Sequence, residues 1–420
     1  MDYRDNDRER VIIAGLHTGS RDYINDTTDE SMRELGELVD TAGGEVVGEM
    51  VQNRPIPDSG TYFGEGKLDE LKEAVVALDA TLVVFDDELS PVQLRNISEH
   101  IGVRVLDRSM LILDIFAMRA RSGEGKLQVE LAQLKYQLPR LRGMGIELSR
   151  TGGGIGTRGP GETKLESDRR HIRTRIAALE EEIREIKKHR SLLRGRREKD
   201  GVITAAIVGY TNAGKSTLLN RLTDAGVFAE DKLFATLDTT SRAITLEDNR
   251  KIVLIDTVGF IRKLPHYLIE AFKSTLEEAA SADFLIHVID ASSPEADNCI
   301  KVVKDVLTEI GAGGKPVINV YNKCDLDGDY IPADDGCNVF ISAKTGMGID
   351  ELINAIADTA PGKKKERTLL IPYSQGGVLN SLHSSEKVLS ENYTADGTEV
   401  TVLIDDIVYN RLQEYEINKG

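Results

Sequence analysis

Residues 209–216 read GYTNAGKS and match the pattern G-x-x-x-x-G-K-S, which is typical of a loop that binds phosphate groups. A strand-like apolar run, residues 204–209, precedes the loop, and a helical pattern begins at Lys215. This is the strand–loop–helix context that the pattern requires. Backbone N–H groups of residues 212–216 and the helix N-terminus would then face the phosphates of a nucleoside triphosphate.

The residue types in this loop have distinct expected roles. Lys215 would bridge the outer phosphates, and the hydroxyl of Ser216 would ligate Mg²⁺. The other expected nucleotide contacts in this segment are Gly209, Asn212, Ala213, Gly214 and Thr217.

A second apolar run, residues 251–256, ends in the pattern D-x-x-G. Asp256 would hold Mg²⁺ through water, and the amide of Gly259 would meet the γ-phosphate. Turns of this kind are common at strand ends, so the pattern gains weight only because it follows a phosphate loop. We expect Lys215 and Gly259 to act in hydrolysis as well as in binding.

Residues 234–240, which read FATLDTT, lie between these two motifs. One of the threonines is expected to supply another Mg²⁺ ligand when the triphosphate is bound. We choose Thr236 for this metal-binding and catalytic role, with Thr239 and Thr240 as alternatives. The segment could also be an ordinary threonine-rich turn without a role in metal binding. Phe234 and Ala235 are expected to line the nucleotide.

Residues 322–325 read NKCD and follow a strand pattern at residues 316–321. Asp325 would accept hydrogen bonds from N1–H and the exocyclic amine of guanine, a donor pair that adenine lacks. A site built on such bonds discriminates by about 10⁴–10⁵-fold. Lys323 would cover the base plane beside Asn322. The four motifs in this order predict a Mg²⁺-dependent GTPase. The segment that would seat the guanine oxygen on a backbone amide consists of Ser342, Ala343 and Lys344.

Phe260 follows Gly259 at the position where many signalling GTPases carry a glutamine that orients the attacking water. A phenyl ring makes no such hydrogen bond. We therefore expect slow intrinsic hydrolysis, with the missing help supplied by a partner or a moved loop. Help of that kind in trans is worth about 10³–10⁵ in rate.

The patterns around the motifs predict a multidomain α/β protein of 420 residues. Residues 1–118 alternate strand and helix patterns, which indicates an α/β domain with a parallel sheet. Residues 119–199 would form a long antiparallel helical hairpin, 200–362 a Ras-like P-loop GTPase domain, and 363–420 a small α+β domain. The N-terminal strands are expected at 11–14, 45–51, 81–85 and 103–106, and the helices at 32–41, 67–78 and 91–100. In the C-terminal part, strands are expected at 368–372 and 398–404 around a helix at 378–390.

The hairpin is predicted from two apolar seams with the spacing of a coiled coil. Pro139 is expected to kink or end the first helix near Leu138, because its ring displaces a backbone hydrogen bond. The second helix is expected from Lys164 to Arg197, about 50 Å at 1.5 Å per residue. The seams consist of Leu127, Leu131, Leu134, Leu138 and Leu141, and of Ile172, Ile176, Leu179, Ile183 and Ile186.

The hairpin is also the basic part of an acidic chain. The whole chain has a net charge of −17, whereas residues 119–199 hold 21 Lys and Arg against 11 Asp and Glu. This imbalance indicates that one part meets a polyanion. Between the helices, residues 151–163 are rich in glycine, and we favour an RNA-contacting tip over a mobile linker. Its phosphate-gripping candidates are Arg158, Lys164, Arg169 and Arg170.

Other classes of protein and site are disfavoured. Residues 154–159 match G-x-G-x-x-G, but a helix rather than a strand precedes them, so a dinucleotide site is rejected. The chain has no apolar stretch near the ~18 residues of a membrane span, and Cys299, Cys324 and Cys337 show no metal spacing. We expect a cytoplasmic protein that is monomeric when free, with a membrane surface as an alternative location.

Residues 210–216, 234–238 and 256–260 resemble the motifs of the HflX family of translation-factor-related GTPases, and residues 161–166 are similar to its N-terminal signature. One departure is Thr239, where the family pattern has proline after Asp238. The resemblance implies binding to the large ribosomal subunit, with the glycine-rich tip at rRNA near the peptidyl-transferase centre. It also implies GTP-dependent separation of stalled or idle ribosomes, notably under heat stress. The alternatives are a ribosome-assembly GTPase and an RNA-remodelling ATPase that uses the N-terminal domain.

Overall fold

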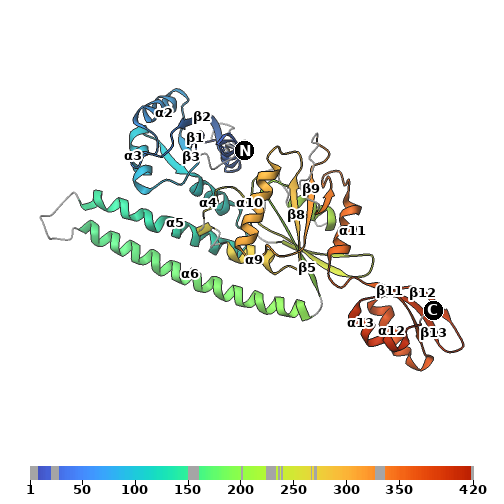
Figure 1. Cartoon of the computed structure of the whole chain (residues 1–420). Helices are drawn as coiled ribbons and strands as arrows, with labels where there is room; N and C mark the ends of the chain where they lie inside the picture. The colour runs from blue at the N-terminus through green and yellow to red at the C-terminus, as the bar shows by residue number, and fades with distance from the viewer. Residues whose placement is uncertain are drawn as a thin grey trace, which may run out of the picture. The chain divides into compact units, whose positions relative to one another are not determined.

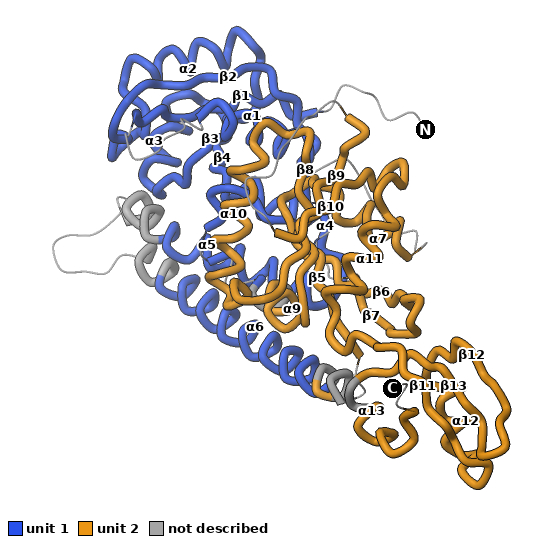
Figure 2. The backbone as a smooth tube through the Cα atoms, turned by 45° about the vertical axis from the view of Figure 1, so that its right-hand side comes forward, with its two compact units in different colours: residues 1–192, 230–238, 258–275 blue, residues 193–229, 239–257, 276–420 orange. Residues whose placement is uncertain are grey.

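Three separate β-sheets organise the chain in a computed structural model (Figure 1). The structure describes residues 8–19, 28–149, 160–199, 202–223, 233–234, 237, 240–265, 267–268, 272–326 and 336–417. Contacts divide the chain into two units (Figure 2). Unit 1 comprises Met1–Leu192, Glu230–Asp238 and Val258–Thr275, and unit 2 comprises Leu193–Ala229, Thr239–Thr257 and Leu276–Gly420.

The first sheet, in unit 1, has four parallel strands in the order β2-β1-β3-β4. The strands are β1 (Arg10–His17), β2 (Glu45–Asn53), β3 (Leu82–Phe85) and β4 (Arg104–Asp107). Helices α1 (Thr28–Thr41), α2 (Glu65–Ala77) and α3 (Pro91–Ile101) connect them. Parallel neighbours need such crossovers, and the prediction of an N-terminal α/β domain is confirmed.

Helix α3 shows how local sequence sets an element boundary. The Ser90 hydroxyl accepts a hydrogen bond from the Gln93 amide at 3.2 Å, and the Gln93 side chain accepts one from the Ser90 amide at 2.9 Å. Pro91 occupies the first helical position, where no N–H is needed. Gly102 ends the helix in the left-handed conformation.

Helix α4 (Arg108–Arg119) was not among the predicted elements. The Asp107 carboxylate caps it by accepting a hydrogen bond from the Met110 amide at 2.9 Å. Residues 111–113 and 115–116 are all buried. A helix that is buried on most sides gives little amphipathic periodicity, which explains why the pattern did not reveal it.

The helical hairpin consists of α5 (Gly123–Ser149) and α6 (Pro160–Lys199), which lie side by side in both views (Figures 1 and 2). All ten seam residues are partly or fully buried, so the predicted seam is confirmed. Ion pairs link the helices, from Arg175 to Glu130 at 2.7 Å and from Arg190 to Glu124 at 2.8 Å. Helix α6 begins at Pro160, four residues before the predicted start.

Pro139 lies inside α5, which continues to Ser149, so an end near Leu138 is wrong. The lost backbone bond is offset by contacts of the next residue, Arg140. Its guanidinium carbon lies 3.3 Å from the Tyr136 ring centroid, and its Nη2 donates to the Leu89 carbonyl at 3.1 Å. Tertiary anchoring of this kind overrides the local preference.

The second sheet, in unit 2, has six strands in the order β10-β9-β8-β5-β7-β6, all parallel except β6. The strands are β5 (Ile203–Gly209), β6 (Thr240–Thr245), β7 (Lys251–Asp256), β8 (Phe284–Asp290), β9 (Val317–Asn322) and β10 (Cys337–Phe340). The helices are α7 (Lys215–Thr223), α9 (Lys273–Ser281), α10 (Ala296–Glu309) and α11 (Ile349–Thr359), of which α9 crosses from unit 1 to unit 2. The predicted motifs follow the carboxyl ends of β5, β7 and β9, the edge where open parallel sheets bind ligands.

The third sheet is antiparallel, with β13 (Thr398–Ile404) between β11 (Lys365–Ile371) and β12 (Lys387–Tyr393). Helices α12 (Gly376–Ser385) and α13 (Asp406–Leu412) pack on it. The predicted helix at 378–390 is therefore wrong beyond Ser385. Residues 387–393 form a strand because they pair with β13, for example Val388 with Val402. Local helix propensity does not include this pairing with a distant segment. None of the helices among the described residues could cross a membrane.

Candidate nucleotide site

The loop between β5 and α7 is shaped by two glycines. Gly214 has φ +97°, and a Cβ there would lie 2.2 Å from the side-chain nitrogen of Asn322. A Cβ at Gly209 would lie 2.3 Å from the carbonyl oxygen of Val288. A larger residue at either position would push the loop away from β8 and β9, so the glycine pattern is required by close packing.

Lys215 is folded back onto this loop. Its Nζ donates to the carbonyl oxygens of Gly209 at 3.1 Å and Tyr210 at 2.7 Å. Burial lowers the pKa of Lys215 to about 8, against an opposing effect of the nearby Asp256 carboxylate. An anionic ligand would favour the charged ammonium, so the site suits phosphate groups.

Two oxygen-bearing side chains that were predicted to hold Mg²⁺ lie together near Lys215. The Ser216 hydroxyl donates to Oδ2 of Asp256 at 2.8 Å, and Asp256 is fully buried. A hydroxyl next to a carboxylate is the hard oxygen donor set that Mg²⁺ prefers. These residues therefore fit the ion, which would neutralise developing phosphate charge when bound.

The expected base-reading residues connect directly to the phosphate loop. The Asn322 amide donates to the Ala213 carbonyl at 2.9 Å, and its oxygen accepts from the Ala343 amide at 2.9 Å. The Ser342 hydroxyl is the main cause that holds the pKa of Asp325 below its usual value, so this carboxylate is ionised at neutral pH. The buried Asn322 side chain thus connects the phosphate loop to the turn at residues 342–344.

Lys323 is positioned by a residue that sequence reasoning missed. Its Nζ lies 2.7 Å from Oδ2 of Asp290 at the end of β8. Oδ1 of Asp290 also accepts from the Ser292 amide at 3.0 Å, which fixes the carboxylate. The signal in the sequence was an aspartate that ends an apolar strand, a pattern too common to single out.

Unit 2 thus gathers most of the predicted site residues at one edge of its sheet. They are Gly209, Asn212, Ala213, Gly214, Lys215, Ser216, Thr217, Asp256, Asn322, Lys323, Asp325, Ser342, Ala343 and Lys344. Thr236, Ala235 and Thr239 lie outside the described residues. The choice of the magnesium threonine stays a prediction, and the alternative Thr240 begins β6.

Phe234, Gly259 and Phe260 belong to unit 1. The Phe234 ring packs edge-on against Phe116 at 4.7 Å between centroids, in a backbone conformation with φ +52°. Phe260 is only 1% exposed, so its ring serves packing and offers no hydrogen bond to water.

The residues after Phe260 make ion pairs within unit 1 that the motif analysis did not anticipate. Arg262 pairs with Glu30 at 2.7 Å, and Lys263 pairs with Asp87 at 2.7 Å and with Asp86. A signal was present in the sequence, since the basic pair 262–263 complements the acidic run 86–88. Their separation of more than 170 residues hid it.

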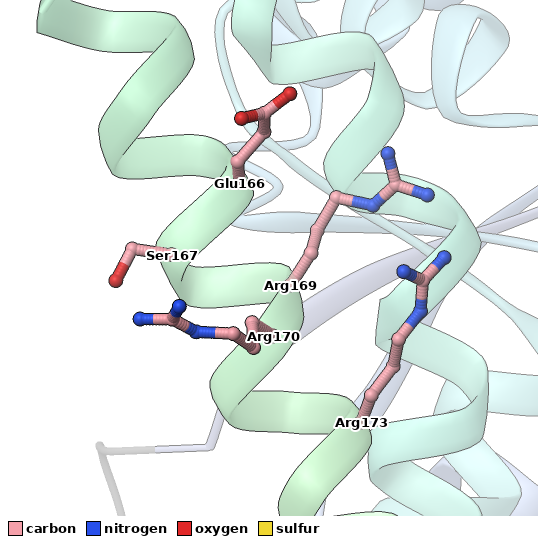
Figure 3. Close-up of a pocket in the computed structure, with 5 residues that line it drawn as sticks. All are labelled: Glu166, Ser167, Arg169, Arg170 and Arg173. Carbon is pink, nitrogen blue, oxygen red and sulfur yellow. The ribbon is translucent and has the colours of Figure 1, made fainter.

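The helical hairpin of α5 and α6, which we call the arm, carries a pocket of about 580 Å³ on α6. It is lined by Glu166, Ser167, Arg169, Arg170 and Arg173 (Figure 3). Arg169 and Arg173 are four residues apart and point to the same side of the helix, whereas Arg170 points away from them. Arg158 and the side chain of Lys164 lie outside the described residues.

Three family models match the chain. The model described as GTP-binding GTPase N-terminal matches residues 29–117, and the one described as GTP-binding GTPase Middle Region matches residues 119–197. The third, described as 50S ribosome-binding GTPase, matches residues 204–323.

Relatives and solved structures similar to this chain cover most of its length. A GTPase HflX of Caldanaerobacter subterraneus subsp. tengcongensis is 50% identical over 412 residues, which cover 98% of this chain and 95% of that protein. A GTPase HflX of Escherichia coli is 44% identical over 93% of this chain and 92% of that protein. A GTP-binding protein of Sulfolobus solfataricus, solved in complex with GDP, is 28% identical and covers 84% of this chain and 98% of that chain, with a TM-score of 0.44. The predicted GTPase activity and multidomain α/β architecture are confirmed, and the identity across nearly the whole chain shows that it belongs to the HflX family of GTPases.

Proposed function

We propose that this GTPase binds the large ribosomal subunit and separates stalled or idle ribosomes into subunits, notably under heat stress. In this proposal the ribosome stimulates hydrolysis in the cytoplasm. The observation that carries it is a nucleotide site and an arginine-lined arm in one chain, supported by the 50S ribosome-binding description of the matched model. The proposed parts are the N-terminal domain 1–118, the arm 119–199, the GTPase domain 200–362 and the C-terminal domain 363–420.

The nucleotide would act as a switch in this account. Ser216, Asp256 and Thr236 would hold Mg²⁺, while Lys215 and the Gly259 amide would contact the terminal phosphate. Loops ordered by the γ-phosphate are released when it leaves. The loops concerned would lie within residues 227–263. The ordered state would favour one ribosome-bound posture of the basic hairpin.

The arm would meet rRNA through its arginines. One guanidinium group can donate two parallel, charge-assisted hydrogen bonds to the oxygens of a phosphate. Arg169 and Arg173 project together beside a pocket wide enough for a phosphate group (Figure 3). The excess of basic residues in 119–199 lies in a chain whose net charge is −17, so contact with RNA would concentrate on this arm.

Reversing the charge of Arg169 and Arg173 to Glu is expected to weaken binding to large ribosomal subunits. Each lost phosphate contact lowers the slope of log K against log salt by about 0.7–0.9. The double variant should therefore show a slope smaller in magnitude by about 1.4–1.8, measured by co-sedimentation at several salt concentrations. Lys301 and Lys304, on α10 of unit 2, provide a matched double reversal that should leave the slope unchanged. An unaltered slope in the arm variant would favour a linker role.

Subunit separation is tested by sedimenting purified joined ribosomes with the protein and GTP. We expect the joined peak to decrease while the two subunit peaks grow, and we expect no change with the Lys215→Ala variant. A ribosome-assembly GTPase would instead leave joined ribosomes intact and bind immature subunits. Persistence of the joined peak would rule out the splitting activity.

The N-terminal domain is less suited to a second nucleotide. The carboxyl end of β3, at the switch point of the sheet between β1 and β3, carries Asp86 and Asp87. Lys263 already pairs with both carboxylates. Acidic groups repel polyphosphates, so the observations do not favour the alternative of an RNA-remodelling ATPase that uses this domain.

A further inference from the structure

Arg221 links the phosphate-loop helix to the turn expected to seat the guanine oxygen. It lies in the last turn of α7, six residues beyond Lys215. Its Nε donates to the carbonyl oxygen of Ala343 at 3.1 Å, and its Nη2 donates to that of Lys344 at 2.6 Å. Both partners lie more than 120 residues away in the sequence, and no motif identified Arg221 as a site residue.

These two bonds fix the direction of the peptide groups in the turn. A trans peptide is planar, and its C=O and N–H point in opposite directions. Because Arg221 holds the Ala343 carbonyl, the Lys344 N–H is directed away from α7. Because it also holds the Lys344 carbonyl, the Thr345 N–H is directed away as well, and it donates to the Ser342 hydroxyl at 3.1 Å.

The other side of the turn is held by Asn322. The Ala343 N–H donates to the Asn322 side-chain oxygen at 2.9 Å, and the Gly346 N–H closes the turn on the Ser342 carbonyl at 2.8 Å. Gly346 has φ +93°, and a Cβ there would be 3.6 Å from the guanidinium carbon of Arg221. The Lys344 amide is thus oriented by a planar guanidinium packed directly against the turn.

We propose that Arg221 is a positioning residue for guanine recognition, which orients the Lys344 amide toward the 6-oxo group of the base. This rests on the proposed nucleotide site. Asp325 would read the N1–H and the 2-amino group, so it senses the 6-oxo group only indirectly, through the N1 proton that a 6-oxo purine carries. The Lys344 N–H would donate to a 6-oxo group, whereas a 6-amino group would place a second donor against it. Arg221 would therefore support the direct contact to the 6-oxo group, while Asp325 reads position 2 and the N1 proton.

The chemistry of the side chain favours this role. A guanidinium presents several donors in a fixed plane, which lets one side chain hold two successive carbonyls. A lysine ammonium at the same place would lack this fork and would hold the turn less firmly. Arg221→Lys is therefore expected to fall between the wild type and Arg221→Ala.

The test compares three triphosphates on the full-length protein with Mg²⁺, by titration calorimetry. They are GTP, inosine triphosphate, which lacks the 2-amino group, and 2,6-diaminopurine riboside triphosphate, which replaces the 6-oxo group with an amine. For Arg221→Ala we expect GTP to bind about tenfold more weakly, the loss of roughly one strong hydrogen bond. The preference for GTP over the diaminopurine nucleotide should shrink, while the preference over inosine triphosphate stays.

The controls separate this role from a structural one. Arg411, an exposed arginine of α13, is the matched substitution, and Arg411→Ala should change none of the three affinities. In ribosome-stimulated turnover, Arg221→Ala should raise the KM for GTP and leave kcat unchanged, because the phosphate contacts remain. An equal loss for all three nucleotides would mean that Arg221 only stabilises the loop. Unchanged selectivity would likewise overturn the proposal, whereas a wild type without guanine preference would overturn the nucleotide site itself.

Discussion

Lys215→Ala is expected to abolish productive GTP binding and hydrolysis, with an affinity loss of about 10²-fold or more. The Lys215 ammonium is buried beside the phosphate loop and donates to two of its carbonyls. It would exchange these partners for phosphate oxygens, and hydrogen bonds of charged groups contribute about 1.5–3 kcal/mol each. Calorimetry with GTP and Mg²⁺ measures the affinity, and phosphate release measures turnover.

Lys315 provides a matched control for this substitution. Its Nζ also donates to a main-chain carbonyl, that of Ala282 at 2.6 Å, but it lies outside the predicted site residues. Lys315→Ala should retain both GTP affinity and turnover. Unimpaired hydrolysis by Lys215→Ala would mean that the reaction occurs at another site.

Asp325→Asn is expected to convert the guanine preference into a preference for xanthine. The ionised carboxylate accepts from two donors of guanine, whereas an amide offers one acceptor and one donor. Xanthine carries an oxygen in place of the 2-amino group, which the amide can bind. Sites built on such bonds discriminate by about 10⁴–10⁵-fold, so we expect GTP affinity to fall by at least about 10³-fold.

Competition between GTP and xanthosine triphosphate for the protein measures this change. Asp305, which is exposed on α10, allows the same isosteric substitution at a neutral position. Asp305→Asn should keep the preference for GTP. If Asp325→Asn also kept it, another group would have to read the base.

The nucleotide site could be predicted from the sequence because its parts are local. A strand, a glycine loop and a helix start follow one another at residues 203–215, and the chain direction of a parallel sheet brings such loops to one edge. The side chains of Ser216 and Asp256 therefore meet as the motif order implies. The hairpin seam was predictable for the same reason, since its spacing is a property of each helix alone.

The features that escaped prediction depend on distant contacts. Strand β12 forms because its backbone pairs with that of β13. Helix α5 continues past Pro139 because Arg140 contacts the Tyr136 ring and the Leu89 carbonyl. The bond between Arg221 and Ala343 joins residues 122 positions apart. No local pattern carries that information, because it arises only when the sheet brings the segments together.

The nucleotide site at the sheet edge of unit 2 is expected to select guanosine triphosphate over adenosine triphosphate. Titration calorimetry of the nucleotide-free, full-length protein with Mg²⁺ tests it most directly, with GTP and ATP compared in the same buffer. We expect GTP to bind at least about 10³-fold more tightly than ATP, because a base-reading carboxylate requires the donor pair of guanine. Equal affinities for the two nucleotides would contradict it.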